Sequence, residues 1–378
     1  MKLVVDENIP QGKEAFGRFG DIVLSNGRKI TNEMLKDADA LIVRSITDVN
    51  NELLENTKVK FVGTATIGTD HIDKDYLAKE NIRFADAAGC NAFSVAEYVV
   101  CSMLQYLISK NKKFEESSIG IIGCGNVGSK VARFAKSLGM KVLMNDPPLE
   151  RENGGDVYCS FDAAITADIV TFHVPLNKTG EDKTYHLLNG INIAKIKSGA
   201  LLINSSRGPV VKNDVLLKRL KEKSDLFTVL DVWENEPNFN PELLDLVNFG
   251  TPHIAGYSFE GKMNGTKIIH DRLSEFLNTG SVWQPEYPEI KKKEFKFDSS
   301  KNFEIELNKL TCGIYSLVLD SSDLKKSLMM DDNSRPKYFD ELRKKYYIRR
   351  EFSNYTVEVI PQDEEIKNKL TALRFTVK

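Results

Sequence analysis

Three side chains able to do acid–base and anion-binding chemistry follow three successive apolar runs of the chain. Arg207 lies in NSSRGP after ALLIN, Glu236 in NEP after LFTVLDVW, and His253 in TPHIAGYS after LVNFG. A guanidinium can bind a planar carboxylate through two hydrogen bonds, and an imidazole can take the proton of a hydroxyl group. A carboxylate can orient that imidazole and stabilise its positive charge. If the three runs are buried strands, the trio suits a 2-hydroxy acid as substrate.

His253 is the best acid–base candidate among the five histidines of the chain. It follows Pro252 in a segment with neither helical nor strand periodicity. The position of His253 alone would suit a structural histidine of the core about as well. The assignment of an acid–base role therefore depends on its occurrence with Arg207 and Glu236. The other four lie where structural roles are favoured: His71 in a Gly/Thr-rich loop, His173 at a strand end, His186 in KTYHLLNG, and His270 in an apparent helix.

A dinucleotide-binding fingerprint lies within residues 117–146. A strand, a G-x-G-x-x-G turn, a helix and a second strand that ends in Asp146 follow one another there. The glycines allow a tight turn and close approach of a pyrophosphate to the helix N-terminus. The Asp146 carboxylate suits the ribose hydroxyls and would repel a 2′-phosphate, which favours NAD over NADP. The expected contacts are Gly123, Gly125, Asn126, Val127, Gly128 and Asp146.

Composition excludes several other classes of protein. The net charge of −2 and the lack of a basic stripe disfavour a nucleic-acid binder. No apolar run approaches the roughly 20 residues that span a bilayer, and the N-terminus lacks a signal-peptide core. The five cysteines have no CxxC spacing, and no ligand cluster for a metal is apparent. We therefore expect reduced thiols, no metal and a cytoplasmic protein.

The first ninety residues alternate strand-like and helix-like segments, which indicates a small parallel α/β unit. Thr31 and Asp73 are expected to cap two of its helices, and residues 92–113 form a long connecting helix. The expected strands are KLVVD (2–6), DIVLS (21–25), ALIVR (40–44), KFVGTAT (60–66) and NIRFAD (81–86).

Beyond the fingerprint, strands are expected at residues 167–174, 199–204 and 226–231, and a helix at 271–280 that closes at Gly280. Residues 282–302 are charged and rich in proline, as in a linker. The final segment has β-like pieces, FEIEL, YSLVL, YTVEVI and LRFTV, interleaved with helix candidates. We predict an α/β protein with two Rossmann-like, doubly wound parallel-sheet domains and a small C-terminal α+β domain. The expected limits are 1–94 with 254–285 for the substrate domain, 95–253 for the NAD-binding domain, and 286–378 for the last domain.

Residues 120–258 resemble the D-isomer-specific 2-hydroxyacid dehydrogenases. The matching phrases are GIIGCGNVG, FHVPLNKTGEDKTYHLLN, LLINSSRGPVV, VLDVWENEP and TPHIAGYS, in the same order and at similar spacing. The resemblance implies that Arg207, Glu236 and His253 are the catalytic residues. It also implies contacts to NAD from Asp146, Val174, Ser205, Ser206, Arg207, Asp231 and Gly256. Val174 stands where relatives often carry Thr, which leaves a backbone contact there.

The phrases DENIP, VRSIT, TATIGTDHID, AEYV and HIAGYSFEGK are similar to one branch of that family, which oxidises a phosphorylated 2-hydroxy acid. The extra C-terminal domain also suits that branch, in which it makes a homodimer. By this resemblance Ser45, Thr66 and Tyr257 contact the substrate. Arg44 is a candidate cation for the phosphate, although a solvated surface arginine explains it equally well. Arg349 and Arg350 are further candidates, reaching a site across a dimer.

Two other functions remain open at this point. A dehydrogenase of the same family could act on 3-phosphoglycerate, glycerate or lactate, because the cofactor half does not distinguish among them. A non-catalytic NAD-sensing scaffold could keep the fold. Such a scaffold has little reason to retain Arg207, Glu236 and His253 together, so the sequence favours an enzyme.

Overall fold

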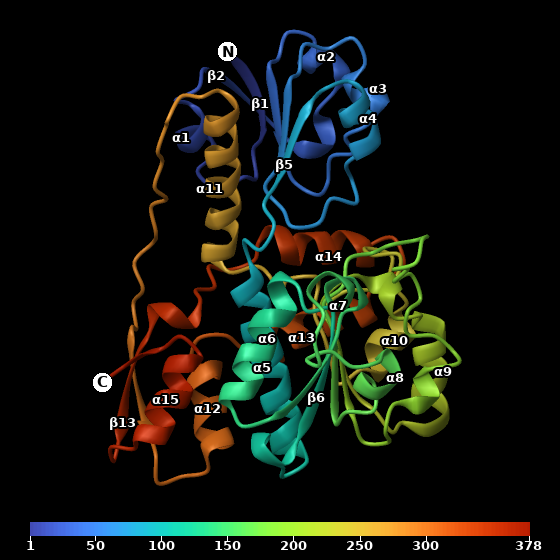
Figure 1. Cartoon of the computed structure of the whole chain (residues 1–378), viewed down its shortest axis with the longest axis vertical. Helices are drawn as coiled ribbons and strands as arrows, with labels where there is room; N and C mark the ends of the chain where they lie inside the picture. Colours follow the sequence, from blue (N-terminus) through green and yellow to red (C-terminus); the bar gives the residue numbers. More distant parts are fainter. The chain divides into compact units, whose positions relative to one another are not determined.

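The computed structural model describes all 378 residues, which form two compact units (Figure 1). The first unit consists of Met1–Asn91 and Ser258–Ile290. The second consists of Ala92–Tyr257 and Lys291–Lys378. The chain therefore leaves the first unit after residue 91 and returns to it after residue 257.

The first unit is built on a five-stranded parallel sheet in the order β2-β1-β3-β4-β5. The central strand β3 is the run ALIV, and all four of its side chains are buried. Such continuous apolar strands are typical of parallel sheets covered on both faces. The strands are β1 (Lys2–Asp6), β2 (Asp21–Ser25), β3 (Ala40–Val43), β4 (Phe61–Thr64) and β5 (Arg83–Asp86).

The helices of this unit start and end partly as the sequence predicts. Asp73 caps its helix by accepting a hydrogen bond from the backbone N–H of Tyr76, whereas Thr31 occupies a cap position without such a bond. The last helix begins after the cap residue Ser258 and ends at Phe276, so the expectation that it closes at Gly280 is wrong. The helices are α1 (Gly12–Phe16), α2 (Asn32–Leu35), α3 (Asn51–Leu54), α4 (Lys74–Lys79) and α11 (Phe259–Phe276).

The second unit contains a six-stranded parallel sheet in the order β11-β10-β9-β8-β6-β7. Figure 1 shows α5 and α6 on one side of this sheet and α8, α9 and α10 on the other, as in a doubly wound fold. Its strands are β6 (Ser118–Ile122), β7 (Lys141–Asn145), β8 (Ile169–Phe172), β9 (Leu201–Asn204), β10 (Phe227–Leu230) and β11 (Phe249–Gly250). Its helices are α5 (Ala92–Ser109), α6 (Asn126–Ser137), α7 (Pro147–Asn153), α8 (Phe161–Ala164), α9 (Asn213–Lys223) and α10 (Pro241–Leu246).

Helix α5 is apolar around most of its circumference. By length and composition alone it could cross a membrane, but most of its side chains are buried within the protein. Its Tyr98 hydroxyl hydrogen-bonds the Thr251 hydroxyl at 2.8 Å. The helix is therefore a core element of the second unit.

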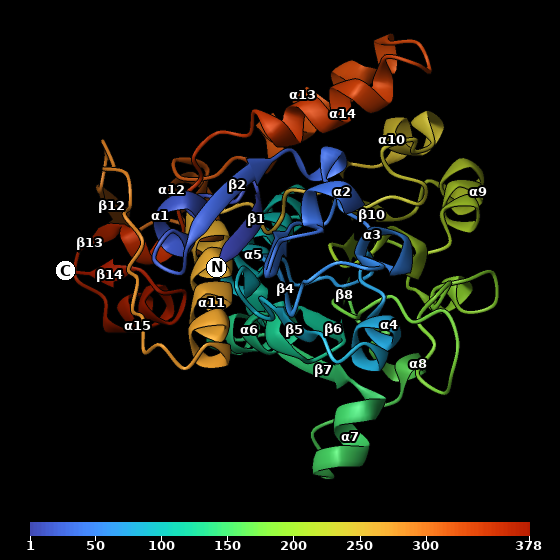
Figure 2. The same cartoon turned by 90° about the horizontal axis from the view of Figure 1, so that it is seen from above.

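The C-terminal segment belongs to the second unit and carries a three-stranded parallel sheet, β12-β13-β14 (Figure 2). Two expectations here are wrong: FEIEL lies in helix α12, and YSLVL runs into helix α13. Strand β12 lies within residues 282–302, the segment expected to be a linker. The elements are β12 (Glu294–Asp298), α12 (Phe303–Cys312), α13 (Leu317–Lys325), α14 (Arg335–Lys344), β13 (Thr356–Ile360), α15 (Glu364–Ala372) and β14 (Thr376–Val377).

Six short 3₁₀ turns connect these elements. They are Gly27–Lys29, Phe114–Glu116, Ile193–Lys195, Gly208–Val210, Lys326–Met329 and Phe352–Asn354. The predicted fold class, two parallel α/β sheets and a small C-terminal sheet-and-helix part, is confirmed.

Candidate active site

Strands β9, β10 and β11 bring the segments of the catalytic trio to one edge of the second sheet. The three strands are parallel neighbours, and Leu230 pairs with Asn204 on one side and Gly250 on the other. The loops that carry Arg207, Glu236 and His253 each start within a few residues of these paired positions. The carboxyl edge of a doubly wound sheet is the usual place for a ligand site, so the predicted convergence of these loops has a structural basis.

Glu236 and His253 form a direct hydrogen bond between Oε1 and Nδ1. The second oxygen of Glu236 accepts a hydrogen bond of 3.1 Å from the backbone N–H of Trp233, which fixes the carboxylate. The side chains are 24% and 30% exposed, so they are shielded yet reachable by a small ligand. Burial opposes ionisation of Glu236, but the attraction of His253 and of Arg343 outweighs it and lowers the pKa of the carboxyl. With Nδ1 engaged, Nε2 is the imidazole nitrogen left for proton exchange with a substrate.

The backbone around His253 is held in place by Asp231, at the end of β10. His253 has a φ of 55°, a left-handed conformation that is uncommon for a non-glycine residue. Its N–H donates to the Asp231 carbonyl at 2.7 Å. The Asp231 carboxylate, 1% exposed, accepts from the Thr251 hydroxyl and from the N–H groups of Ile254 and Ala255. Asp231 therefore fixes the loop that displays the imidazole.

The loop that carries Arg207 rests on the segment that leads to Glu236. The Arg207 carbonyl accepts from the Asn204 side chain at 2.9 Å, and its guanidinium donates to the Ser206 carbonyl at 2.8 Å. A Cβ on Gly208 would lie 2.0 Å from the carbonyl carbon of Trp233. The two loops thus touch through backbone atoms, and only glycine fits there.

The glycine turn has the shape that a pyrophosphate requires. Gly123 has a φ of 88°, and a Cβ on Gly128 would lie 1.9 Å from the Gly123 carbonyl oxygen. A Cβ on Gly125 would meet nothing within 4 Å, so open space lies beside the turn where a phosphate can approach. Helix α6 begins at Asn126 directly after it and continues through Val127, so its N-terminal N–H groups face that space. These features fit a bound dinucleotide.

Asp146 directly follows β7 and lies beside this turn. One of its oxygens accepts from the Cys124 N–H at 2.7 Å, and the other caps α7 by accepting from Leu149 N–H. The carboxylate is half-buried and remains at the turn, where two ribose hydroxyls can reach it. Its position agrees with a role in holding the adenosine half of NAD.

The remaining predicted cofactor residues line strand ends of the same sheet. Val174 follows β8, and its Cγ1 would lie 2.8 Å from a Cβ on Gly123. Ser206 hydrogen-bonds Asn204 through both N–H and hydroxyl, whereas the buried Ser205 hydroxyl has no partner. Gly256 lies in the turn after His253 and is half-buried.

The predicted substrate residues of the first unit form a group of their own. Arg44 and Ser45 follow β3, and Thr66 follows the neighbouring strand β4. The Thr66 hydroxyl contacts the Thr64 hydroxyl at 2.8 Å, and Thr64 in turn hydrogen-bonds the His71 ring. Arg44 is half-buried and makes a long 3.4 Å contact with the Asn8 carbonyl, while Ser45 is exposed. These side chains therefore gather at one edge of the first sheet.

The other histidines have structural environments. His270 is fully buried and hydrogen-bonds Asp271 and Ser281. His186 pairs with Glu234 at 2.5 Å. Burial lowers the pKa of His173 to about 3, which leaves this ring neutral at ordinary pH. His270 and His173 therefore give no competing acid–base centre, whereas His186 forms a second histidine–glutamate pair outside the trio.

Sequence reasoning missed one cation beside the trio. Arg343, on α14, lies with its guanidinium carbon 5.7 Å from the centre of the Tyr257 ring, and its charge contributes to the lowered pKa of Glu236. No local motif marks it: it stands in a Lys/Arg-rich helix far along the chain. Arg349 is buried and donates to the carbonyls of Ala255 and Ser94, and Arg350 donates to Asn354.

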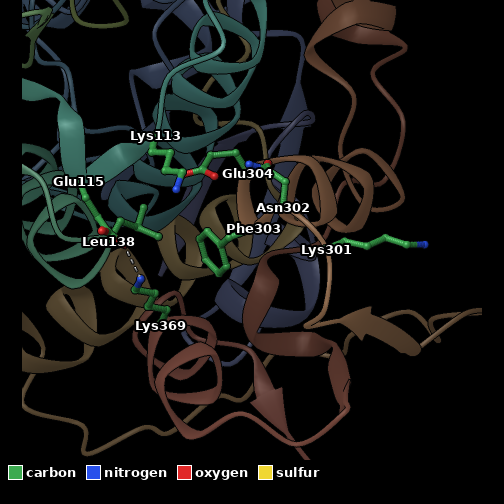
Figure 3. A pocket seen from close by; sticks show the side chains of 8 residues that line it. All are labelled: Lys113, Glu115, Leu138, Lys301, Asn302, Phe303, Glu304 and Lys369. Carbon is green, nitrogen blue, oxygen red and sulfur yellow. Dashed lines mark hydrogen bonds and ion pairs between the residues drawn. The ribbon is translucent and has the colours of Figure 1, made fainter.

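A pocket of the second unit lies elsewhere, between the start of α12, the turn before β6 and α15 (Figure 3). Lys369 reaches across it to Glu115 at 3.1 Å. None of the residues predicted for the catalytic or cofactor site lines this pocket. Its lining residues are Lys113, Glu115, Leu138, Lys301, Asn302, Phe303, Glu304 and Lys369.

Comparison with protein families identifies the domain in which the candidate site lies. The model of the NAD-binding domain of D-isomer specific 2-hydroxyacid dehydrogenases matches residues 104–255, which hold the glycine turn and the whole trio. The presence of an NAD-binding domain in this part of the chain is thereby confirmed. A second model, a domain of unknown function, matches residues 287–373.

Individual relatives cover nearly the whole chain. It is 39% identical to the erythronate-4-phosphate dehydrogenase of Marinobacter nauticus over the full length of both proteins. It is 42% identical to the protein of that name from Bacteroides thetaiotaomicron, over 94% of this chain and 99% of the relative. Among solved structures, NAD⁺-bound 3-phosphoglycerate dehydrogenase from Entamoeba histolytica superposes with a TM-score of 0.64 at 25% identity, covering 75% of this chain and 97% of that one.

Proposed function

Since the chain belongs to the D-isomer-specific 2-hydroxyacid dehydrogenase family, we propose that it oxidises 4-phospho-D-erythronate with NAD⁺. The products are 2-oxo-3-hydroxy-4-phosphobutanoate and NADH, in a step of pyridoxal 5′-phosphate (vitamin B6) synthesis. The substrate follows the name of the full-length relatives. The observation that carries the chemistry is the hydrogen-bonded Glu236–His253 pair at the strand edge that also bears the Arg207 loop.

Each member of the trio has a distinct task in this reaction. Arg207 binds the substrate carboxylate, and Nε2 of His253 takes the proton of the C2 hydroxyl group. Glu236 stabilises the imidazolium that develops during the step, because its charge is already oriented toward Nδ1. NAD⁺, when bound, accepts the hydride that leaves C2.

The cofactor is expected to lie along the carboxyl edge of the second sheet. The turn from Gly123 to Gly128 and the start of α6 would hold its pyrophosphate, and Asp146 its adenosine ribose. Because Asp231 is buried and already holds the 251–255 loop, we assign it the positioning of His253 together with any contact to the cofactor. Further contacts are assigned to Val174, Ser205, Ser206 and Gly256.

The remaining substrate contacts in this proposal are the ones that the sequence resemblance implies. Ser45 and Thr66 bind the substrate, Arg44 assists at the phosphate, and Tyr257 contributes from the turn after His253. We further propose a cytoplasmic homodimer in which residues 286–378 make the dimer contact. The substrate domain then comprises residues 1–94 and 254–285, and the NAD-binding domain residues 95–253.

Initial rates of NADH formation test the proposal. With NAD⁺ in excess, the purified protein should oxidise 4-phospho-D-erythronate with a higher kcat/KM than 3-phospho-D-glycerate, D-glycerate or D-lactate. His253→Ala should bind NAD⁺ normally but lose turnover by about 10²–10⁴-fold, the usual contribution of a general base. A preference for 3-phosphoglycerate would identify a different member of the family. Full turnover by the His253 variant would refute the mechanism.

A further inference from the structure

Helix α14 carries a cation to the turn that follows His253. Its Phe339 is fully buried in the core cluster that includes Trp233 and Phe239, and this contact anchors the helix. Arg343 lies one turn later on the same face, with its guanidinium 5.9 Å from the Phe339 ring and 5.7 Å from the Tyr257 ring. The buried phenylalanine therefore fixes where the arginine points.

Tyr257 links this cation to the reaction centre. The Tyr257 N–H closes a turn onto the carbonyl of Ile254, the residue after His253. Its ring packs edge-on against Tyr346 with centroids 5.8 Å apart and has the Arg343 guanidinium nearby. Glu236 and Tyr257 both act to raise the pKa of Arg343, against the effect of burial, so the cation lies within electrostatic range of the acid of the trio.

The Arg343 guanidinium hydrogen-bonds the side chain of Tyr257 and lies at a distance from the carboxylate of Asp340. Oδ1 of Asp340 is 3.9 Å from Nη1 of Arg343, at the outer limit of an ion pair. Its Nε is buried and has no hydrogen-bond partner, and the side chain is only 21% exposed. An unsatisfied buried donor on a cation is costly, and an anion bound there would satisfy it. The site thus fits an anionic group of a ligand.

We propose that Arg343 binds the phosphate of the substrate, with Tyr257 beside it. This inference rests on the proposed function. The substrate has two anionic ends, and Arg207 is assigned the carboxylate. The planar fork of an arginine matches phosphate oxygens, and a cation placed beside the turn after the imidazole can reach the far end of a four-carbon acid. The C-terminal segment would then determine specificity for a phosphorylated substrate.

The neighbouring arginines do not compete for this task. Arg349 is 1% exposed, lies 3.9 Å from the Tyr315 ring centre and donates to two backbone carbonyls. Arg350 is buried and donates to Asn354. Both are therefore committed to packing within the second unit, which makes Arg343 the better ligand for an external anion.

The test compares a phosphorylated and a phosphate-free acid on the same variants. For Arg343→Gln, we expect the KM for 4-phospho-D-erythronate to rise about 10- to 150-fold, the range for a hydrogen bond to a charged group. The KM or inhibition constant of D-erythronate should change less than about threefold. Arg343→Lys should recover part of the loss, because it restores the charge without the fork. Lys344→Gln, which removes the same charge from an exposed neighbour, should behave as wild type.

The outcomes separate the possible errors. If wild type does not oxidise the phosphorylated acid, the proposed function fails, whatever Arg343 does. If wild type is active and both Arg343 variants keep its KM, the residue does not bind the phosphate. An equal loss on both acids, with a lower kcat and a shifted pH profile, would make Arg343 a positioning residue for Glu236 and overturn the proposal. Circular dichroism and NAD⁺ binding check that each variant is folded, and Arg343→Lys remains decisive if the Gln variant is not.

Discussion

The Glu236–His253 pair is the smallest part of the molecule that can be tested by itself. Glu236→Gln keeps the shape of the side chain and an acceptor for the Trp233 N–H but removes the charge opposite Nδ1. We expect kcat to fall about 10²–10⁴-fold with little change in KM, because the charge acts as the imidazolium forms. Steady-state kinetics with saturating NAD⁺ measure both constants.

A second glutamate–histidine pair nearby gives a matched control. Glu234 and His186 are joined at 2.5 Å and have similar exposure, but they lie outside the trio. Glu234→Gln should therefore leave kcat within about threefold of wild type while testing the general cost of losing such a pair. Equal losses of kcat in the Glu234 and Glu236 variants would contradict the assignment of Glu236 to the chemistry.

The sequence identified candidate site residues that stand in recognisable local motifs. It missed a site residue whose position depends on contacts between distant parts of the chain. Arg207, Glu236 and His253 stand in phrases that follow apolar strands, so their convergence could be predicted. Arg343 is close to Tyr257 only because Phe339 anchors α14 in the core, and nothing in its local sequence marks that contact.

Two glycines of the second unit, Gly208 and Gly125, have different surroundings, so replacing each by alanine should have a different effect. In Gly208→Ala the new methyl group would lie 2.0 Å from backbone atoms of Trp233, an overlap that no rotamer relieves. The loops of Arg207 and Glu236 must then separate, so we expect a loss of about 2–4 kcal/mol in the free energy of unfolding and little activity. Urea denaturation and NADH formation measure the two effects.

Gly125→Ala is the counterpart in the cofactor turn. Its methyl group meets no protein atom within 4 Å, so the free energy of unfolding should stay near that of wild type. The methyl group would occupy the space beside the pyrophosphate and weaken NAD⁺ binding by about 1–3 kcal/mol, or roughly 5- to 150-fold. Unchanged affinity in a titration of NAD⁺ would place the pyrophosphate elsewhere.

Among whole elements, sequence predicted the buried parallel strands well and failed in α12. FEIEL alternates apolar and acidic residues, as a half-buried strand does. In the structure Asn302 caps a helix there, and Glu304 is buried because it accepts from the Phe114 N–H at 3.0 Å. Ile305 is instead 54% exposed. The acidic side chain is thus buried and the apolar one exposed, because Glu304 binds the distant Phe114 N–H. A local sequence pattern does not reveal such a contact.

On the scale of the whole molecule, buried ionisable side chains join the C-terminal segment to the NAD-binding part of the second unit. Arg349 donates to the Ala255 carbonyl, and the buried Glu97 of α5 accepts from the Phe352 N–H at 2.9 Å. Burial raises the pKa of Glu97 well above its ordinary value. The C-terminal segment therefore supports the loop after His253 within one chain, in addition to the dimer contact proposed for it.

Asp320, in the first turn of α13, makes the stability of this assembly depend on pH. It is buried and accepts a hydrogen bond of 2.7 Å from the Tyr346 hydroxyl, and burial raises its pKa from 3.8 to about 6. The folded protein thus binds this proton more tightly than the unfolded chain. The favourable contribution is fully present below pH 3.8 and is lost as pH rises through about 6. Ionised Asp320 therefore costs stability at neutral pH.

Asp320→Asn removes this ionisation and keeps an oxygen to accept from Tyr346. The variant should exceed wild type in free energy of unfolding by up to about 3 kcal/mol near pH 7.5, and the difference should vanish near pH 4. Asp323→Asn, on the same helix but 46% exposed and paired with Lys326, should change stability by no more than about 0.5 kcal/mol at either pH. Urea denaturation across this pH range measures all three proteins. A variant no more stable than wild type at pH 7.5 would mean that the buried carboxylate ionises without cost, through compensation by Arg349.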